Sequence, residues 1–356
     1  IDDISFAAMQ DRIRGWERKE GALTLEAYLR SISENSKVTI FCHDNPDPDA
    51  LASALAMSEL FSSHGHSSQI VHGGMIEHHQ NQAMVKELAI PIRRIILDWE
   101  ITDLIKESDI IVAVDFHRPG ANNILPTDCI PHIIIDHHSV DDSVTADLAM
   151  VSSEYSSTSS MVASLLMSSD FTMNSTVATA LAFGIKTDTL GFTRNFNAVD
   201  VRALLWINAW VDKDKLRAIE MPPRSIEALE SFSTALNDKV QLDSLILAPV
   251  RNLTNRDSLA QIADFLLPTE GIDTVVAFGV KRGKVILSAR SNKHDLHVGK
   301  LLSTNFPGGL AGGHKSLGGG QIPLDVIAER GTHSEQDHVE IVMDKVKTML
   351  QNIFLN

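Results

Sequence analysis

The sequence predicts an α/β protein: a parallel-sheet domain with flanking helices, followed by a smaller α/β domain with a mixed sheet. Its first half holds short, continuous apolar runs separated by helical patterns, which is typical of strands buried on both faces. The three clearest runs end in polar residues and cover 37–42, 109–114 and 130–135. The second half contains a hairpin pattern at 273–290 instead. A length of 356 residues also favours two domains.

The expected boundaries follow from these patterns and from the breakers between them. We expect a helical N-terminal extension at 1–36, the parallel-sheet domain at 37–212, a linker at 213–232 and the second domain at 233–356. Pro222-Pro223 and a charged stretch locate the linker. Apolar patterns predict helices at 50–61, 101–107, 161–167, 174–186, 197–216, 259–267, 296–302 and 339–354. A glycine-rich loop is expected at 306–321.

Composition argues against two classes of protein. The formal net charge is −15, whereas a protein that holds long DNA or RNA by its phosphates needs a basic face. No apolar run reaches the ~18 residues of a membrane span, and the first residues lack a signal-peptide pattern. Cys42 and Cys129 adjoin predicted strands and are expected to be buried thiols. We therefore expect a cytoplasmic protein with neither a membrane nor a long nucleic acid as partner.

The loop from His43 to Asp49 is the first candidate metal site. It follows the first strand and precedes a strong helix, and Pro46 and Pro48 force an extended, rigid turn. The turn fixes the directions of Asp47 and Asp49, which together with His43 can address two neighbouring cations. The alternative is that Asp49 only caps the helix.

Two further strands and one helix also end in potential metal ligands. Asp115 follows the strand at 109–114, and Asp136-His137-His138 ends another buried run. Because the carboxyl ends of parallel strands share one edge of a sheet, where ligands bind, these side chains should meet. Asp188 stands at the end of the helix 174–186, where a carboxylate opposes the helix dipole. A cation partner would explain its placement.

These residues supply more ligands than one tetrahedral zinc ion can use. The candidates are four carboxylates and two imidazoles: His43, Asp47, Asp49, Asp115, His137 and Asp188. Mixed oxygen and nitrogen ligands suit two manganese or similar divalent ions. Two ions roughly 3.5–4 Å apart support in-line displacement at phosphorus, which predicts phosphoester hydrolysis. His138 would stay off the metals and donate to a phosphoryl oxygen, and Asp136 would orient a histidine.

Two stretches in the second half could contact phosphate. Gly312-Gly313-His314-Lys315 lies in the glycine-rich loop, where a bare backbone can approach a ligand; a flexible turn is the alternative. Arg290-Ser291 ends the predicted hairpin as a candidate phosphate clamp. In the first half, the serine-rich residues 152–160 either cap a helix or bring its N-terminus to a phosphate, and the sequence favours neither.

Together these stretches resemble the DHH phosphoesterase superfamily, in its two-domain form with a DHH-associated C-terminal domain. The matching motifs are His43-Asp44-Asn45-Pro46-Asp47-Pro48-Asp49, Asp115, Asp136-His137-His138 and Asp188, with Gly312-Gly313-His314-Lys315 similar to the glycine-histidine motif of the second domain. The resemblance spans roughly residues 35–325. Length and layout are most similar to the nanoRNase and phosphoadenosine-phosphatase group.

The resemblance implies a role for each of these residues. One Mn²⁺ would be held by His43, Asp47 and Asp115, and the other by Asp49, Asp115, His137 and Asp188. His138 would contact the substrate or transition state. Arg290 and His314 would bind the substrate from the C-terminal domain, with the active site in the cleft between the domains.

The implied function is a manganese-dependent phosphodiesterase that cleaves dinucleotides or very short RNA, such as linear diguanylate, to mononucleotides. Alternatives for the same centre are a 3′-phosphoadenosine 5′-phosphate phosphatase and a cyclic-dinucleotide phosphodiesterase. A nucleotide-binding regulator without catalysis is a rival from another class, although every ligand position is intact. The family's loop typically continues with alanines after the histidine, whereas Lys315-Ser316 follows here and Ala311 replaces a glycine. Substrate choice is therefore less fixed than chemistry, and a homodimer is compatible with the sequence.

Overall fold

The computed structural model divides the chain into two units, residues 1–222 and 223–356. The described residues are 15, 19–76, 78–140, 144–193, 196–223, 225–313, 315–327 and 335–355. The division falls inside the predicted linker, which contains α8 (Lys213–Glu220) and the start of α9 (Ile226–Asp238). None of the helices described is both long and apolar enough to cross a membrane.

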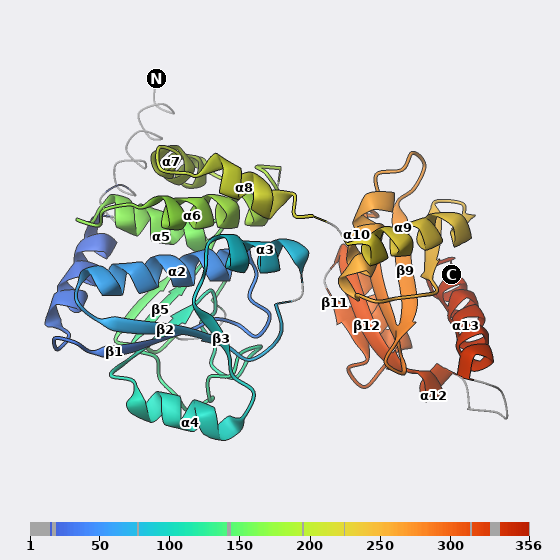
Figure 1. Ribbon diagram of the computed structural model, residues 1–356, viewed down its shortest axis with the longest axis horizontal. Helices are drawn as coiled ribbons and strands as arrows, with labels where there is room; N and C mark the ends of the chain where they lie inside the picture. The colour runs from blue at the N-terminus through green and yellow to red at the C-terminus, as the bar shows by residue number, and fades with distance from the viewer. Residues whose placement is uncertain are drawn as a thin grey trace. The chain divides into compact units, whose positions relative to one another are not determined.

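Unit 1 is built on a six-stranded, fully parallel sheet, which confirms the predicted architecture (Figure 1). Across the sheet the strands are β3 (Ile92–Arg94), β2 (Ser67–His72), β1 (Lys37–Phe41), β4 (Ile110–Val114), β5 (Ile133–Asp136) and β6 (Leu148–Val151). The strand order therefore reverses between β1 and β4. In such sheets ligands bind outside the carboxyl ends of the strands at this reversal.

Helices cover both faces of this sheet (Figure 1). On one face α2 (Pro48–Ser63), α5 (Thr158–Met167) and α6 (Ser175–Asp188) share a core with the helical residues 19–31. On the other face α4 (Asp98–Glu107) covers a smaller core. The short α3 (His79–Glu87) lies on the first face, where Met84 joins the larger core. Buried Cys42 lies in the larger core as predicted, whereas Cys129 is only partly buried.

Small residues let the helices of the larger core approach closely. A Cβ atom at Gly184 of α6 would lie 2.3 Å from Oγ of Ser159 on α5 and 3.2 Å from Cβ of Ala52 on α2. Because no side chain fits there, α6 can lie against both helices. Their ends are thereby held in fixed positions relative to one another, which matters because all three contribute to the site described below.

The prediction of a single helix at 197–216 is wrong. The segment forms two helices, α7 (Ala198–Ile207) and α8, separated by residues 208–212. The break is stabilised by Asp212, whose carboxylate accepts the N–H groups of Asp214 and Lys215 at 3.1 and 3.0 Å. The backbone N–H of Asp212 donates to Oγ1 of Thr179 at 2.9 Å, so this residue starts a new helix and ties it to α6.

Unit 2 contains a mixed six-stranded sheet, as predicted. Across the sheet the strands are β11 (Ala311–Gly313), β12 (Leu317–Pro323), β10 (Lys284–Ser291), β9 (Thr274–Lys281), β8 (Leu245–Val250) and β7 (Val240–Leu242). Only the β8–β9 pair is parallel. The predicted hairpin is confirmed: Arg282 and Gly283 both have positive φ, at 49° and 71°, which matches the tight turn that joins twisted strands.

The helices of unit 2 cover its sheet unevenly. On one face α9 packs mainly over β8, and α10 (Asp257–Leu266) packs over β9 and β10. The opposite face carries α11 (Val298–Asn305) and α13 (Glu335–Leu355), with the short α12 (Leu324–Ile327) at the end of β12. On the α10 face, residues of β10, β11 and β12 line a groove beside α10.

The prediction of a glycine-rich loop at 306–321 is wrong in its second half, which forms β11 and β12. Gly318 explains part of the glycine content, because a Cβ there would lie 2.7 Å from Leu302 and 2.9 Å from Val298. Both are core residues of α11. The glycine thus lets α11 pack directly on a strand, a requirement of the tertiary fold that a local sequence pattern does not reveal.

Candidate metal centre

The six predicted ligands meet at the carboxyl edge of the parallel sheet. They come from the loops after β1, β4 and β5 and from the end of α6. Within the described part of the chain, three groups of His and Asp side chains have ligand atoms within 4.8 Å of one another. The groups are His43, Asp47 and Asp115; Asp49, His137 and Asp188; and Asp115, His137 and His138. Each of the six residues therefore belongs to a potential metal-binding group, and these groups meet at Asp115 and His137.

The loop after β1 is set by the start of α2. Asp47 is the N-cap of this helix, since its Oδ1 accepts the N–H groups of Asp49 and Ala50 at 3.0 Å each. The alternative that Asp49 caps the helix is therefore wrong. Asp49 lies in the first turn, fully buried, and the proline-defined turn directs both carboxylates toward the sheet edge.

Asp49 is fixed by the N-terminus of a second helix. Its Oδ2 accepts the N–H of Thr158 at 2.7 Å, and its Oδ1 accepts the N–H of Ser159 at 2.6 Å. Oγ of Ser157 caps the same helix by accepting the N–H of Ser160 at 3.0 Å. The serine-rich stretch thus provides helix caps, and its free N–H groups hold a carboxylate of the protein itself rather than a phosphate.

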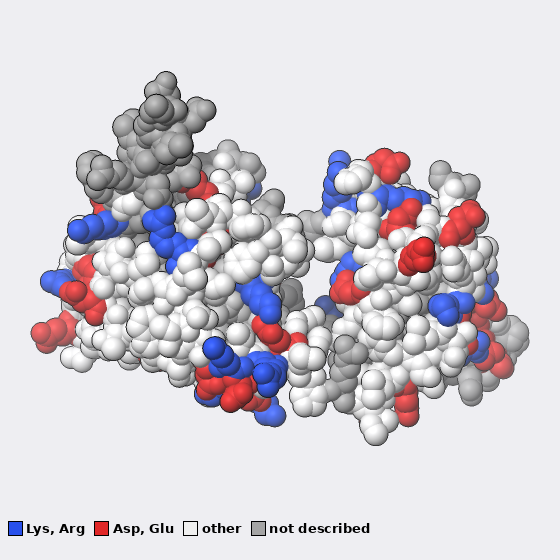
Figure 2. All heavy atoms as spheres, turned by 90° about the horizontal axis from the view of Figure 1, so that it is seen from above, with Lys and Arg blue, Asp and Glu red and all other residues white. Residues whose placement is uncertain are grey.

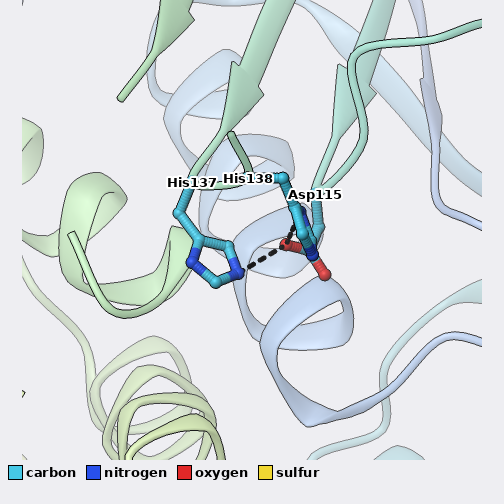
Figure 3. Close-up of side chains that lie close together, drawn as sticks. All are labelled: Asp115, His137 and His138. Atoms are coloured by element: carbon cyan, nitrogen blue, oxygen red, sulfur yellow. Dashed lines mark ion pairs between the residues drawn. The ribbon is translucent and has the colours of Figure 1, made fainter. Parts of the chain in front are cut away.

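Asp115 stands at the centre of the cluster in an unusual backbone conformation. Its φ angle is 64°, the left-handed region that few residues other than glycine, asparagine and aspartate adopt. The residue is 4% exposed, and Oγ1 of Thr158 donates to its Oδ1 at 2.7 Å. Figure 3 shows His137 and His138 turned toward this carboxylate, with Nε2 of His137 at 3.7 Å and Nδ1 of His138 at 3.9 Å from Oδ1. Such local strain is typical of functional sites.

The remaining separations have the spacing of groups that share cations. Nε2 of His43 lies 3.8 Å from Oδ1 of Asp47 and 3.6 Å from Oδ2 of Asp115. Nε2 of His137 lies 3.4 Å from Oδ2 of Asp188 and 3.9 Å from Oδ2 of Asp49. These atoms are too far apart for strong hydrogen bonds but close enough for one ion to contact both.

The electrostatics of the cluster favour bound cations. Burial raises the pKa of Asp115 well above its usual range, and the neighbouring carboxylates Asp49 and Asp47 raise it further. Burial also raises the pKa of Asp49. Burial alone would raise the pKa of Asp47, but the nearby His43 and the hydrogen bonds from backbone N–H groups hold it below its usual range. Buried carboxylates that crowd one another are stabilised by divalent ions, so the donor set fits a two-metal site.

Asp136 lies behind the cluster and binds two histidines. Its Oδ1 accepts Nδ1–H of His138 at 2.7 Å, and its Oδ2 accepts Nδ1–H of His117. Burial alone would raise the pKa of Asp136, but these hydrogen bonds hold it below its usual range. The bond to Asp136 in turn raises the pKa of His138. The predicted pairing of Asp136 with a histidine is therefore present, and His138 keeps Nε2 available for another partner.

Two residues of the centre are not among the sequence-derived candidates. Thr158 contacts Asp115 through its hydroxyl and Asp49 through its backbone, but it lies within a serine-rich stretch that gives it no distinctive signal. His117 holds Asp136 and stands two residues beyond Asp115. That proximity to a strand-end ligand is the one sequence signal that could have identified it.

The predicted substrate-binding residues of unit 2 fall into two places. Arg290 and Gly312 line a groove of about 700 Å³ beside α10, whereas Gly313, Ser291 and Lys315 are not among its lining residues. The Ser291 hydroxyl is buried and bonds Thr274 and the backbone of Asp273. Lys315 is exposed, and His314 lies outside the described residues.

Comparison with known families and relatives gives matches over both units. The DHH family N-terminal domain matches residues 37–185, and the DHHA1 domain matches residues 242–352. The uncharacterized protein MJ1633 of Methanocaldococcus jannaschii is 35% identical over 304 residues, which is 84% of this chain and 61% of that protein. The cyclic-di-AMP phosphodiesterase GdpP of Geobacillus thermodenitrificans is 27% identical over 332 residues, 88% of this chain and 48% of GdpP.

A solved structure shares the fold. The exopolyphosphatase-related protein from Bacteroides fragilis superposes with a TM-score of 0.67 at 18% identity, over 94% of this chain and 97% of that one. At this identity the likeness concerns the fold alone. The chain spans about half to three-fifths of the length of the two relatives described above.

Proposed function

This chain belongs to the DHH phosphoesterase superfamily, and on that premise we propose that it is a manganese-dependent phosphodiesterase for dinucleotides and very short oligoribonucleotides. The observation that supports this proposal most is the cluster itself. Four carboxylates and two imidazoles converge on one sheet edge, and His138 stands beside them, oriented by a buried carboxylate. A set of ligands for two metal ions with a proton donor beside it can support phosphoester hydrolysis.

The residues that would hold the ions follow from the groups of neighbouring ligand atoms. His43, Asp47 and Asp115 would hold one ion, and Asp49, His137, Asp188 and Asp115 the other. Bound divalent ions supply a nucleophile at neutral pH and stabilise charge on the phosphoryl oxygens. The mixed oxygen and nitrogen donors suit manganese.

The protein's own part in the reaction is to position groups and donate a proton. Nδ1–H of His138 donates to Asp136, so in the protonated ring Nε2–H is the donor left for a phosphoryl or leaving-group oxygen, and the ring becomes neutral when that proton is transferred. The hydrogen bond to Asp136 raises the pKa of His138, which favours the protonated ring. Thr158 and the N-terminus of α5 hold Asp115 and Asp49, so these carboxylates need not reorganise during the reaction.

A short anionic substrate fits the charge of the chain. The net charge is −15, and Figure 2 shows Lys and Arg side chains interspersed with Asp and Glu on the face drawn there. A long polyanion needs a continuous basic surface, whereas a dinucleotide needs only local charge. In unit 2, the groove contains Arg256, Lys284 and Arg290, and we assign Arg290 to a substrate phosphate.

A cyclic-dinucleotide phosphodiesterase is the second candidate. The name of GdpP, a relative that matches 88% of this chain, favours it. Both activities use the same metal centre, so the distinction depends on the substrate and not on the chemistry.

Product analysis of a substrate panel tests the proposal. The full chain with Mn²⁺ is incubated with 5′-phosphorylated dinucleotides, RNAs of two to ten nucleotides, cyclic dinucleotides and 3′-phosphoadenosine 5′-phosphate. We expect the highest kcat/KM for linear dinucleotides, with a decline as the RNA lengthens. Faster turnover of a cyclic dinucleotide would favour the second candidate. Nucleotide binding without metal-dependent product release would contradict both and favour a regulator.

A further inference from the structure

The guanidinium of Arg290 is held from two sides inside unit 2. Its Nε donates to Oδ1 of Asp264 on α10 at 2.6 Å. Its Nη1 donates to Oγ of Ser288 and to the backbone oxygen of Ala289, each at 3.1 Å. Among the described residues, Nη2 has no hydrogen-bond partner. Two of the three nitrogens are therefore used to fix the plane of the group, and the third remains for a ligand.

This arrangement lies along one wall of the groove beside α10. Alternate residues of β10 face the groove, from Lys284 through Ile286 and Ser288 to Arg290, while the intervening residues pack into the core on the other face. Ser288 pairs with Gly319 of β12, whose neighbour Gly312 on β11 has no atom within 4 Å of where a Cβ would stand. The floor next to the fixed guanidinium is therefore bare backbone, which a ligand can approach closely.

The pairing of Asp264 with Arg290 is hard to explain as a stabilising element. The Asp264 side chain is 57% exposed and that of Arg290 is 20% exposed. Ion pairs this open to water contribute little to folding. A carboxylate beside the arginine also costs affinity for any anion, because it repels a phosphate and neutralises the arginine charge. Asp264 must therefore have a compensating benefit, and its hydrogen bond to Nε of Arg290 provides one by fixing the orientation of the guanidinium.

We infer that Asp264 is a positioning residue for substrate binding. It holds the long Arg290 side chain in one rotamer, with Nη2 presented to a substrate phosphate in the groove. This inference rests on the proposed function, in which Arg290 binds substrate. An arginine already held in its bound conformation loses less side-chain freedom on binding, so removing Asp264 should raise KM about threefold to tenfold.

A positioning role and a purely electrostatic role for Asp264 predict opposite changes in KM when its charge is removed. If Asp264 acts only through its negative charge, removing the charge should strengthen the binding of an anionic substrate and lower KM. If it positions Arg290, Asp264→Ala should raise KM, whereas Asp264→Asn should largely restore it because the amide oxygen can still accept from Nε. The exposed Glu270, six residues along the chain, provides a matched control, since Glu270→Ala removes one negative charge from the same unit.

Steady-state kinetics on the full chain with Mn²⁺ tests the inference. KM and kcat for a 5′-phosphorylated diadenylate are measured for wild type, D264A, D264N, E270A, R290A and the D264A/R290A double variant. We expect a raised KM with little change in kcat for D264A, near wild-type values for D264N and E270A, and no further effect of D264A once Arg290 is absent.

Each other outcome contradicts the inference. A lowered KM in both D264A and D264N would show that the carboxylate only opposes the substrate. A raised KM in the double variant relative to R290A would show that Asp264 acts without Arg290. A loss of kcat without a change in KM would place its effect elsewhere. Failure of the proposed function is distinct, because the wild-type chain would then not hydrolyse the dinucleotide.

Discussion

The candidate metal centre of unit 1 and the groove of unit 2 hold their polar groups by different means. In the metal centre, buried Asp49 is bound by two backbone N–H groups, and buried Asp115 by a buried hydroxyl. In the groove, Arg290 is fixed by the largely exposed Asp264. Backbone groups at strand and helix ends keep their positions when one side chain changes, whereas an exposed partner does not. The catalytic chemistry should therefore resist variation that readily alters substrate binding.

Asp115→Asn should have the largest effect, because Asp115 touches both groups of candidate ligands. We expect a loss of kcat/KM on the order of 10³-fold or more, as the loss of a ligand common to both ions removes several kcal/mol of transition-state stabilisation. Asparagine tolerates the backbone φ of 64°, so the fold should persist. Activity and circular dichroism are measured beside the exposed control Asp103→Asn. Retained manganese-dependent hydrolysis in D115N would contradict the assignment of Asp115 to both ions.

His138→Gln should reduce kcat by about 10²-fold or more while leaving manganese binding nearly intact, since it removes a proton donor and not an assigned ligand. Comparing kcat with the Mn²⁺ concentration for half-maximal activity separates the two effects. The assignment would fail if Mn²⁺ binding fell as far as in D115N, or if kcat were unchanged.

Thr158→Val should weaken manganese binding about tenfold to a hundredfold, because groups that hold a metal ligand typically matter to that extent. The substitution preserves shape and removes the hydroxyl that donates to Asp115. Thr102→Val on α4, where the hydroxyl bonds only its own helix, is the matched control. Equal Mn²⁺ affinity in the two variants would show that the Thr158 bond is dispensable.

The smallest expected effect is on the pH dependence of stability without metal. The folded state binds the proton of Asp115 more tightly than the unfolded chain does, because its pKa is raised. The contribution of protonated Asp115 to the free energy of unfolding is therefore fully present below the unfolded pKa of about 3.9. It is lost as the pH rises through the pKa of the folded state.

In a chelator, wild type should consequently be less stable than D115N near neutral pH, and the difference should narrow as the pH is lowered toward 4. Urea unfolding of both proteins at several pH values measures this difference. A stability difference between wild type and D115N that widens as the pH falls would contradict the raised pKa of Asp115.

The sequence was sufficient to predict the parallel sheet and the convergence of six candidate ligands at its edge, because both depend on local signals. A buried parallel strand appears as an apolar run, and a polar residue at its end lies at the ligand-binding edge wherever the strand belongs in the sheet. Asp115 and His137 could be identified in this way without knowing the strand order. Asp188 could be identified from a local signal too, because a carboxylate at the C-terminal end of a helix is unfavourable beside the helix dipole unless it has a cation partner.

The features that escaped prediction depend on contacts between distant segments. A glycine-rich stretch does not reveal that β12 pairs with β10, or that α11 packs on β12 where Gly318 leaves room. The bond from Thr158 to Asp115 joins residues 43 positions apart. The partner of Arg290 was missed because Asp264 lies 26 residues earlier, on helix α10, in an ordinary amphipathic pattern.

Calorimetric titration of Mn²⁺ into the metal-free protein measures the central claim, that acidic and imidazole groups from separate strand ends bind a pair of ions. We predict two ions per chain for wild type and a loss of at least one of them in D115N, with the fold retained. No binding by wild type, or an Mn²⁺ stoichiometry and affinity that D115N leaves unchanged, would contradict the account.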